Sequence, residues 1–302
     1  MLGKCTVIYV MADVRSGSTL LENILSKSDE TVSVGELALL KGHILHEGPG
    51  IKWNWNCSCG TPVLECSFWK DALKGLDIKT PDFDTSINWN YRSSRMLIGS
   101  MLPSVLKRAL QQINARKINR DAVTTLNTIY KNIFQATGKS FIIDSSKDPI
   151  QAYMLYLNQP ADFDVKIIGL TRDLRAIAAS KRKWSIANKK ANQKSLMKLL
   201  SNSLFYKKIY NAIAQLVKQD DVLLLNYEQL ATNTQEQLDR IVAKTGLHPY
   251  SAPQYMYVEN DHTIAGTPQR FTKRPIAYDN SWENTYKGKP VLSLIGKVLN
   301  KI

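Results

Sequence analysis

Five short runs of apolar and β-branched residues constrain the fold of this chain more than any other feature. Longer stretches separate them, and their apolar residues recur at helical spacing, as in Leu20, Leu21, Ile24 and Leu25. Near-continuous apolar strands that alternate with helices are typical of a parallel sheet covered on both faces. We therefore predict an α/β fold. The predicted strands are Thr6–Val10, Thr31–Val34, Ser140–Ile143, Val165–Leu170 and Val222–Leu225.

The chain of 302 residues is long enough for one large domain or two small ones. No linker rich in proline, glycine and serine divides it, and no internal repeat is visible. We expect a single domain over residues 1–302. Two regions interrupt the alternation: an excursion rich in cysteine and tryptophan at about 43–72 and a helical insert at about 185–219.

The charge of the chain narrows the class of ligand. The sequence has 40 Lys and Arg against 26 Asp and Glu, a formal net charge of +14. Such an excess indicates an anionic ligand or surface (a nucleotide, an acidic glycan, nucleic acid or phospholipid), although positive charge also serves solubility alone. No apolar run reaches the roughly 18 residues of a membrane span, and no secretory signal is visible. We expect a soluble, cytoplasmic protein without a transmembrane segment.

The loop after the first predicted strand has the composition of an oxyanion site. Ser16 and Gly17 are small enough for backbone amides to approach a ligand, and Arg15 adds a fork of donors suited to phosphate or sulfate. Ser18 or Thr19 can cap the helix that begins there, and a helix N-terminus favours an anion. The loop lacks the lysine of a Walker A motif. A turn that uses serine and glycine for geometry alone is the alternative.

A second anion site is predicted after the strand Val165–Leu170. Arg172 stands at the carboxyl end of that strand, where open α/β sheets bind ligands. Ser180 lies eight residues further on, so it can converge with Arg172 only if the chain bends before the next helix. In the alternative, Arg172 pairs with Asp173 or with a neighbouring helix end.

Five segments, in order along the chain, resemble the sulfotransferases that use 3′-phosphoadenosine 5′-phosphosulfate (PAPS). Arg15–Leu21 is similar to their 5′-phosphosulfate loop, and Arg172–Ser180 is similar to their 3′-phosphate motif. The other three are Asp144–Pro149, Asn226–Leu230 and His262–Phe271, similar to a strand-end Lys-Asp-Pro segment, a later helix and a late loop of bacterial members. The chain is identified as a member related to the carbohydrate and tyrosylprotein branches. The resemblance implies a P-loop-kinase-like fold and transfer of a sulfuryl group from PAPS to a hydroxyl or amine.

The resemblance also implies roles for single residues. Arg15 would stabilise the bridging oxygen and the 5′-phosphate, with backbone amides from Ser16 to Thr19 around the phosphosulfate. Lys147 would reach the sulfuryl oxygens. The remaining donor-binding residues would be Arg172 and Ser180 on the 3′-phosphate, together with Tyr227 and Arg270 on the nucleotide. One departure is Asp13, where the family often has Gly-x-Pro before the loop arginine, because it brings a negative charge near the phosphosulfate.

The family needs a base for the acceptor, and Glu36 is the candidate. It follows the second predicted strand, and in the tyrosylprotein branch a glutamate in this neighbourhood deprotonates the acceptor. A carboxylate in a partly dry cleft suits that task. Alternatively, Glu36 caps the helix that begins at Leu37. His43 and His46 are rival bases.

Three cysteines, Cys57, Cys59 and Cys66, could join His43 or His46 in a zinc site. The Cys-x-Cys spacing is tight, however, and a redox-sensitive disulfide or simple buried thiols are the favoured interpretations. No metal is therefore assigned, and sulfuryl transfer is expected to need none.

The stretch 174–219 contains eleven basic residues and no acid, and it includes two predicted helices, Ser195–Leu204 and Phe205–Lys218. Aromatic residues between the lysines (Trp184, Phe205, Tyr206 and Tyr210) could stack on nucleic-acid bases. Amphipathic helices with an apolar stripe and solvated lysines are favoured instead, on a surface that can bind an acidic acceptor. The expected partners are thus PAPS and a carbohydrate, lipid or small molecule, not nucleic acid. A P-loop-type kinase and a non-catalytic nucleotide-binding or nucleic-acid-binding protein are the alternatives.

Overall fold

A central sheet of five parallel strands organises the molecule, in the spatial order β2-β3-β1-β4-β5. The computed structural model describes residues 4–46, 55–80, 83–90, 93–189, 193–257, 261–266 and 271–302. All five predicted strands are present, which confirms the α/β prediction. The strands are β1 (Cys5–Ala12), β2 (Thr31–Gly35), β3 (Phe141–Lys147), β4 (Phe163–Thr171) and β5 (Val222–Asn226), and a separate pair consists of β6 (Tyr255–Met256) and β7 (Arg274–Pro275).

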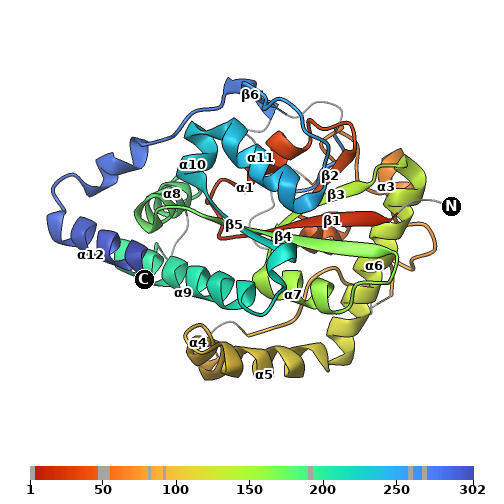
Figure 1. Cartoon of the computed structure of the whole chain (residues 1–302), viewed down its shortest axis with the longest axis horizontal. Helices are drawn as coiled ribbons and strands as arrows, with labels where there is room; N and C mark the ends of the chain where they lie inside the picture. The colour runs from red at the N-terminus through yellow and green to blue at the C-terminus, as the bar shows by residue number, and fades with distance from the viewer. Residues whose placement is uncertain are drawn as a thin grey trace.

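Helices cover both faces of the sheet, as Figure 1 shows. The bounds of the α-helices are α1 (Ser18–Leu25), α2 (Leu40–Leu45), α3 (Ser67–Ala72), α4 (Ser94–Gly99), α5 (Pro103–Asn114), α6 (Lys117–Thr137), α7 (Pro149–Leu157), α8 (Leu174–Ala187), α9 (Leu196–Ala214), α10 (Tyr227–Thr232), α11 (Thr234–Thr245) and α12 (Pro290–Lys301). The 3₁₀ helices are η1 (Leu37–Leu39), η2 (Gln219–Asp221) and η4 (Ser281–Tyr286).

The central strand β1 shows why the sheet is buried on both sides. Its side chains alternate, so that Val7 and Tyr9 enter the core beneath α6, α7 and α9, whereas Ile8 and Val10 enter the core beneath α1, α10 and α11. All four side chains are buried. A strand with apolar side chains on both faces is stable only between two layers of helices.

In the described part of the insert, residues 195–218 contain one long helix. Two helices were predicted between residues 195 and 218, but α9 runs unbroken from Leu196 to Ala214. The boundary was wrong because nothing between Leu204 and Phe205 interrupts helical backbone, and Ile209 and Tyr210 continue the buried stripe.

The C-terminal helix α12 lies against α8 and α9. Leu292 and Leu299 pack on the small core that these helices form with η4. Ile302 follows the end of the helix and is exposed. Within the described ranges, no helix has both the length and the apolar character that crossing a bilayer requires.

Candidate active site

The carboxyl ends of all five strands meet at one edge of the sheet, where parallel α/β sheets bind ligands. Each strand brings one predicted site residue to this edge. These residues are Arg15 after β1, Glu36 after β2, Lys147 at the end of β3, Arg172 after β4 and Tyr227 after β5.

The loop between β1 and α1 has left-handed backbone at two positions, with φ 74° at Arg15 and φ 101° at Gly17. Gly17, not Ser18 or Thr19, is the N-cap of α1, and no side chain caps the helix. The capping prediction was therefore wrong. A β-carbon at Gly17 would lie 2.3 Å from the Tyr227 ring, so glycine lets the loop approach that ring closely.

This loop directs polar groups toward the edge of the sheet. The first hydrogen bond within the turn runs from the Leu20 amide to the Gly17 carbonyl, so the amides of Ser18 and Thr19 have no partner inside the helix. The Ser16 hydroxyl is buried and has no hydrogen-bond partner among the described residues. These groups suit an anion with several oxygen acceptors.

The two predicted anion motifs meet through Arg15. Its Nε donates to Ser180 Oγ over 2.9 Å, and Arg172 Nη1 donates to the Arg15 carbonyl over 3.1 Å. Because α8 begins only at Leu174, the chain bends after Arg172, as the expected convergence required. Ser180, however, contacts the first motif's arginine. The spacing of residues along one helix could not reveal this partner.

Arg172 is held in place by an aromatic ring and a carbonyl. Its guanidinium lies 4.2 Å from the centre of the Tyr227 ring, and Nη2 donates to the Asp279 carbonyl over 3.3 Å. Its Nε is buried without a partner in the part of the chain that the structure describes. Burial and the nearby Arg172 lower the pKa of Arg15. Two arginines this close and partly buried favour an anionic ligand between them.

The alternative pairing of Arg172 with Asp173 is wrong. Asp173 caps α8 by accepting from the Arg175 amide, and its carboxylate also binds the Arg175 guanidinium, with a shortest distance of 2.5 Å. The carboxylate near Arg172 is instead that of Asp279, whose Oδ2 lies 3.7 Å from Arg172 Nη2.

Asp13, the acid that departs from the family pattern in the first loop, forms an ion pair with Lys181. Both carboxylate oxygens of buried Asp13 accept from Lys181 Nζ, over 2.6 and 2.7 Å. Lys181 also donates to Ser203 Oγ over 3.1 Å, which connects the loop to α8 and α9. Lys181 directly follows Ser180 in the sequence, but its partner could not be identified there.

Glu36 and Lys147 form a largely buried ion pair of 2.5 Å between Oε1 and Nζ. The Gly266 amide donates to the same Oε1 over 3.1 Å. The Glu36 side chain makes no cap bond to η1, so the capping alternative is wrong. Lys147, like Arg15, has left-handed backbone (φ 71°).

The segment that supplies Gly266 runs beside β2, a contact the sequence did not signal. Ile264 donates to the Val34 carbonyl over 3.1 Å and accepts from the Glu36 amide over 3.1 Å. Gly35 makes this possible, because a β-carbon there would lie 2.2 Å from the Ile264 oxygen. Arg270, the predicted nucleotide contact in the same late loop, lies outside the described residues.

The two rival bases face a tryptophan. The ring of His43 lies against Trp55, and its Nδ1 is 3.2 Å from the Trp55 carbonyl oxygen. The ring of His46 is stacked on Trp55 with centroids 5.7 Å apart. Of the three candidate bases, Glu36 is thus the one that the structure pairs with Lys147 at the end of β3.

Buried carboxylates support the strand ends. Glu22 on α1 accepts from Ser33 Oγ over 2.6 Å and from Ser145 Oγ over 2.8 Å, which ties β2 and β3 to α1. Asp144 accepts from the Tyr130 hydroxyl over 2.5 Å and from the Ser146 amide over 2.8 Å. Burial raises the pKa of Asp144 to about 6.

The aromatic residues of the basic stretch do not form a stacking surface. Tyr210 is buried, and Phe205 and Tyr206 pack against the large core. Trp184 is exposed on α8. The amphipathic interpretation is thus the one that the structure supports.

The fold and these side chains define a class of protein: a parallel α/β protein with cationic side chains at the carboxyl edge of its sheet, an arrangement suited to a multiply charged anion. The sequence matches the family model described as sulfotransferase domain over residues 6–249. The chain therefore belongs to the sulfotransferase domain family, and it is an enzyme that transfers a sulfuryl group from a sulfate donor to an acceptor. The kinase and the non-catalytic alternatives are set aside.

Solved structures agree on the fold. The sulfotransferase domain from the Synechococcus PCC 7002 olefin synthase is 16% identical, with a TM-score of 0.54, over 99% of this chain and 96% of that one. The sulfotransferase domain from the curacin biosynthetic pathway is 14% identical, with a TM-score of 0.53, over 94% and 91%. At such identity the likeness concerns the fold, which is P-loop-kinase-like. No curated protein sequence matches the chain.

Proposed function

We propose that the sulfate donor is PAPS and that the enzyme transfers its sulfuryl group by in-line displacement to a hydroxyl or amine of an acceptor. One observation carries the proposal: three cations, Arg15, Lys147 and Arg172, come from the carboxyl ends of three adjacent strands, β1, β3 and β4, at the edge where the β1–α1 loop lies. Sulfuryl transfer depends on positioned positive charge and hydrogen-bond donors, and not on a covalent bond between the substrate and the protein.

The buried donors that lack a partner among the described residues fit a donor substrate that has phosphates at both the 3′ and 5′ positions. The Arg172 guanidinium lies over the Tyr227 ring, and its Nε, which has no partner among those residues, is available to the 3′-phosphate. Arg15 and Ser180 are already bonded to each other, so the same contact aligns both with the phosphate groups. The amides of Ser18 and Thr19 face the 5′-phosphosulfate. Arg270 remains a proposed contact from sequence resemblance.

Glu36 is proposed as the base. Among the described residues, both partners of its carboxylate bind Oε1, so Oε2 is the oxygen that can take a proton. As the acceptor oxygen forms its bond to sulfur, its proton passes to Glu36. The bond between sulfur and the bridging oxygen breaks, and charge grows on the 5′-phosphate, where Arg15 stabilises it. Lys147, at the end of β3, is ion-paired with Glu36 and reaches the sulfuryl oxygens from that strand.

We include in the proposal a carbohydrate, lipid or small-molecule acceptor that can be anionic, because α8 and α9 present lysines beside the site. We also propose one functional domain over residues 1–302, since α12 packs on the helix that contains Ser180. A cytoplasmic location is proposed because the four cysteines are unpaired, as is usual in a reducing compartment.

Thermal unfolding with 3′,5′-adenosine bisphosphate, the desulfated donor, tests the donor site. At about 100 times its dissociation constant, the ligand stabilises the folded state by roughly 2.7 kcal/mol. We expect this shift with the bisphosphate and not with 5′-AMP, and we expect Arg172→Ala to abolish it.

Arg108→Ala, an exposed arginine on α5, is the matched control and keeps the shift. Stabilisation by ATP with Mg²⁺, but not by the bisphosphate, would reject PAPS as the donor. Transfer of label from PAPS to candidate acceptors then identifies the acceptor class.

A further inference from the structure

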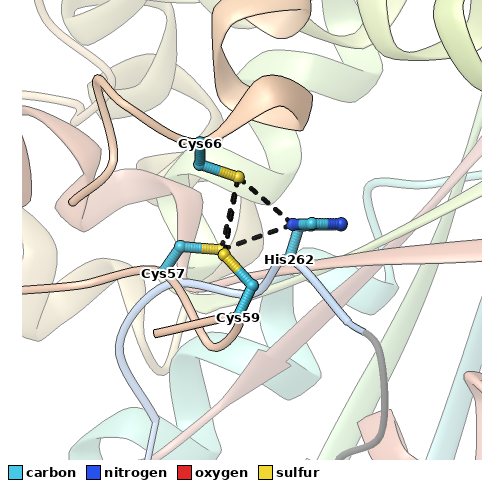
Figure 2. A group of neighbouring side chains, drawn as sticks. All are labelled: Cys57, Cys59, Cys66 and His262. Atoms are coloured by element: carbon cyan, nitrogen blue, oxygen red, sulfur yellow. Dashed lines mark hydrogen bonds between the residues drawn. The ribbon is translucent and has the colours of Figure 1, made fainter. Parts of the chain in front are cut away.

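Three cysteines from one segment and a histidine from a distant segment converge outside the site described above. Cys57, Cys59 and Cys66 surround His262, and one potential ligand atom from each of the four lies within 4.8 Å of the others. Figure 2 shows the three sulfur atoms and the imidazole pointing toward one another. From the sequence, His43 or His46 was the candidate for the fourth ligand. In the structure the histidine beside the cysteines is His262, some 200 residues further along the chain.

The distances are those of tetrahedral coordination. Cys66 Sγ lies 3.8 Å from Cys57 Sγ and 3.7 Å from Cys59 Sγ. His262 Nδ1 lies 3.2 Å from Cys66 Sγ and 3.6 Å from Cys57 Sγ. Metal bonds of about 2.3 Å to sulfur and about 2.0 Å to nitrogen, at tetrahedral angles, place sulfur atoms about 3.8 Å apart and sulfur and nitrogen about 3.5 Å apart. A disulfide would need sulfurs about 2 Å apart.

The backbone around the cluster holds the two segments together independently of the sulfurs. Ser58 donates its amide to the Thr263 carbonyl and accepts the Thr263 amide on its hydroxyl, both over 2.9 Å. The same hydroxyl donates to the Asp261 carbonyl over 2.5 Å. The Phe68 ring is stacked on His262 with an interplanar angle of 5°. The imidazole is therefore oriented before any ligand binds.

We propose that Cys57, Cys59, Cys66 and His262 Nδ1 bind a structural Zn²⁺. Three thiolates and one imidazole form a donor set that zinc prefers in closed tetrahedral sites. The three thiols lose their protons when the metal binds. Four protein ligands leave no open coordination position, so the ion does not take part in sulfuryl transfer.

The metal site would hold two distant segments of the chain together. The metal joins the 57–66 segment to residues 261–266, and the latter segment supplies the Gly266 amide to Glu36 and pairs through Ile264 with the end of β2. The ion would thereby stabilise the wall of the site on which Glu36 lies.

Metal content of the intact protein tests the proposal. Protein expressed with zinc in the medium and passed through a gel-filtration column should retain about one Zn²⁺ per chain by elemental analysis. Exchange for Co²⁺ should give the intense visible bands of a tetrahedral thiolate site. Cys59→Ser is the sharpest variant because this side chain is exposed, and its affinity in competition with a chelator should fall by more than about 100-fold. His262→Gln should behave in the same way.

Two controls make the result specific. Cys5→Ala removes the remaining cysteine, in β1, and His248→Gln removes an exposed histidine, and both should keep the metal. Thiol titration of denatured wild-type protein, prepared without air and with a chelator, should find all four cysteines reduced. Failure of the zinc-free wild-type protein to bind Zn²⁺ or Co²⁺ would overturn the proposal. Loss of two thiols in that titration would show a disulfide instead.

Discussion

Arg15 and Lys147 share an unusual feature of backbone. Both adopt left-handed φ values, 74° and 71°, that a β-carbon disfavours. Each follows or ends a strand at the edge where we propose that the anion binds, and strained residues of this kind gather at functional sites. The strain turns the chain so that one cation faces Ser180 and the other faces Glu36. Ala265 also has a positive φ (56°). It directly precedes Gly266, whose amide donates to Glu36.

The substitution Glu36→Gln tests the proposed role of this single residue as the base. The amide keeps an oxygen for Lys147 and Gly266 but cannot take the acceptor's proton. We expect kcat for transfer from labelled PAPS to fall roughly 10²–10⁴-fold, with unchanged stabilisation by the bisphosphate. Glu236→Gln on α11, an exposed position, is the control. An unaltered kcat in Glu36→Gln would exclude the role.

Asp144 predicts a pH dependence of stability. Burial raises its pKa from 3.8 to about 6 in the folded protein, so between these values the folded state binds more protons than the unfolded state. Its contribution to the free energy of unfolding therefore falls as the pH rises through this window and levels off above about 6. Asp144→Asn removes the titration and keeps an acceptor for Tyr130. Urea unfolding of both proteins from pH 4 to 7 should show wild type losing stability relative to the variant, and parallel profiles would contradict the assignment.

At the scale of elements, α8 connects the two anion motifs. Its first turn is capped by Asp173, which leaves Arg172 outside the helix. Two adjacent residues further along, Ser180 and Lys181, contact the β1–α1 loop at Arg15 and Asp13. One helix thus sets the position of the proposed 3′-phosphate motif and of the proposed 5′-phosphosulfate loop together.

The Asp13–Lys181 pair gives a prediction about this connection. Lys181→Met leaves a buried carboxylate without its partner, which costs about 3–5 kcal/mol and places a negative charge beside the anion site. We expect lower stability in urea and weaker bisphosphate binding. The double variant Asp13→Asn with Lys181→Met should recover most of both.

A matched exposed pair provides the comparison. Lys4→Met breaks the exposed contact with Asp164 and should cost under about 1 kcal/mol. An equal cost at the two lysines would show that the Asp13–Lys181 pair is not a buried connection.

At the scale of the whole molecule, the strand order brings distant segments to one edge. Five strands from residues 5 to 226 end together there, and α12, near the C-terminus, packs on the small core that α8 and α9 form (Figure 1). Asn300 accepts the Leu174 amide over 2.8 Å, directly beside the 3′-phosphate motif. The C-terminal helix is therefore part of the support of the site.

Two adjacent residues of α12 test that support. Leu299 packs on the core with α8, whereas Val298 is 52% exposed. Leu299→Ala should lower the free energy of unfolding by about 1–3 kcal/mol and weaken bisphosphate binding, because a partly buried side chain that packs on this core is lost. Val298→Ala should change stability by less than about 0.5 kcal/mol. Equal effects in urea unfolding would show that α12 does not support α8.

Much of the fold and part of the site were predictable from local pattern. The five strands appear where apolar, β-branched runs occur, because burial on both faces demands such runs. Arg15 and Arg172 were predicted as site residues partly because they stand in segments that follow strands: Arg172 comes directly after β4, and Arg15 lies in the loop that follows β1. The break within α9 and the side-chain cap of α1 were predicted wrongly, since local propensity alone does not decide where a helix ends or what caps it.

Periodicity and motifs of neighbouring residues were enough to predict the α/β class, the strands and the residue types of the proposed anion site. The partners of these residues emerge in the folded chain alone: Ser180 with Arg15, Lys181 with Asp13, Lys147 with Glu36 and His262 with the three cysteines. These contacts join residues far apart along the chain. Their distances depend on the sheet order and on how helices pack against it, which no local pattern specifies.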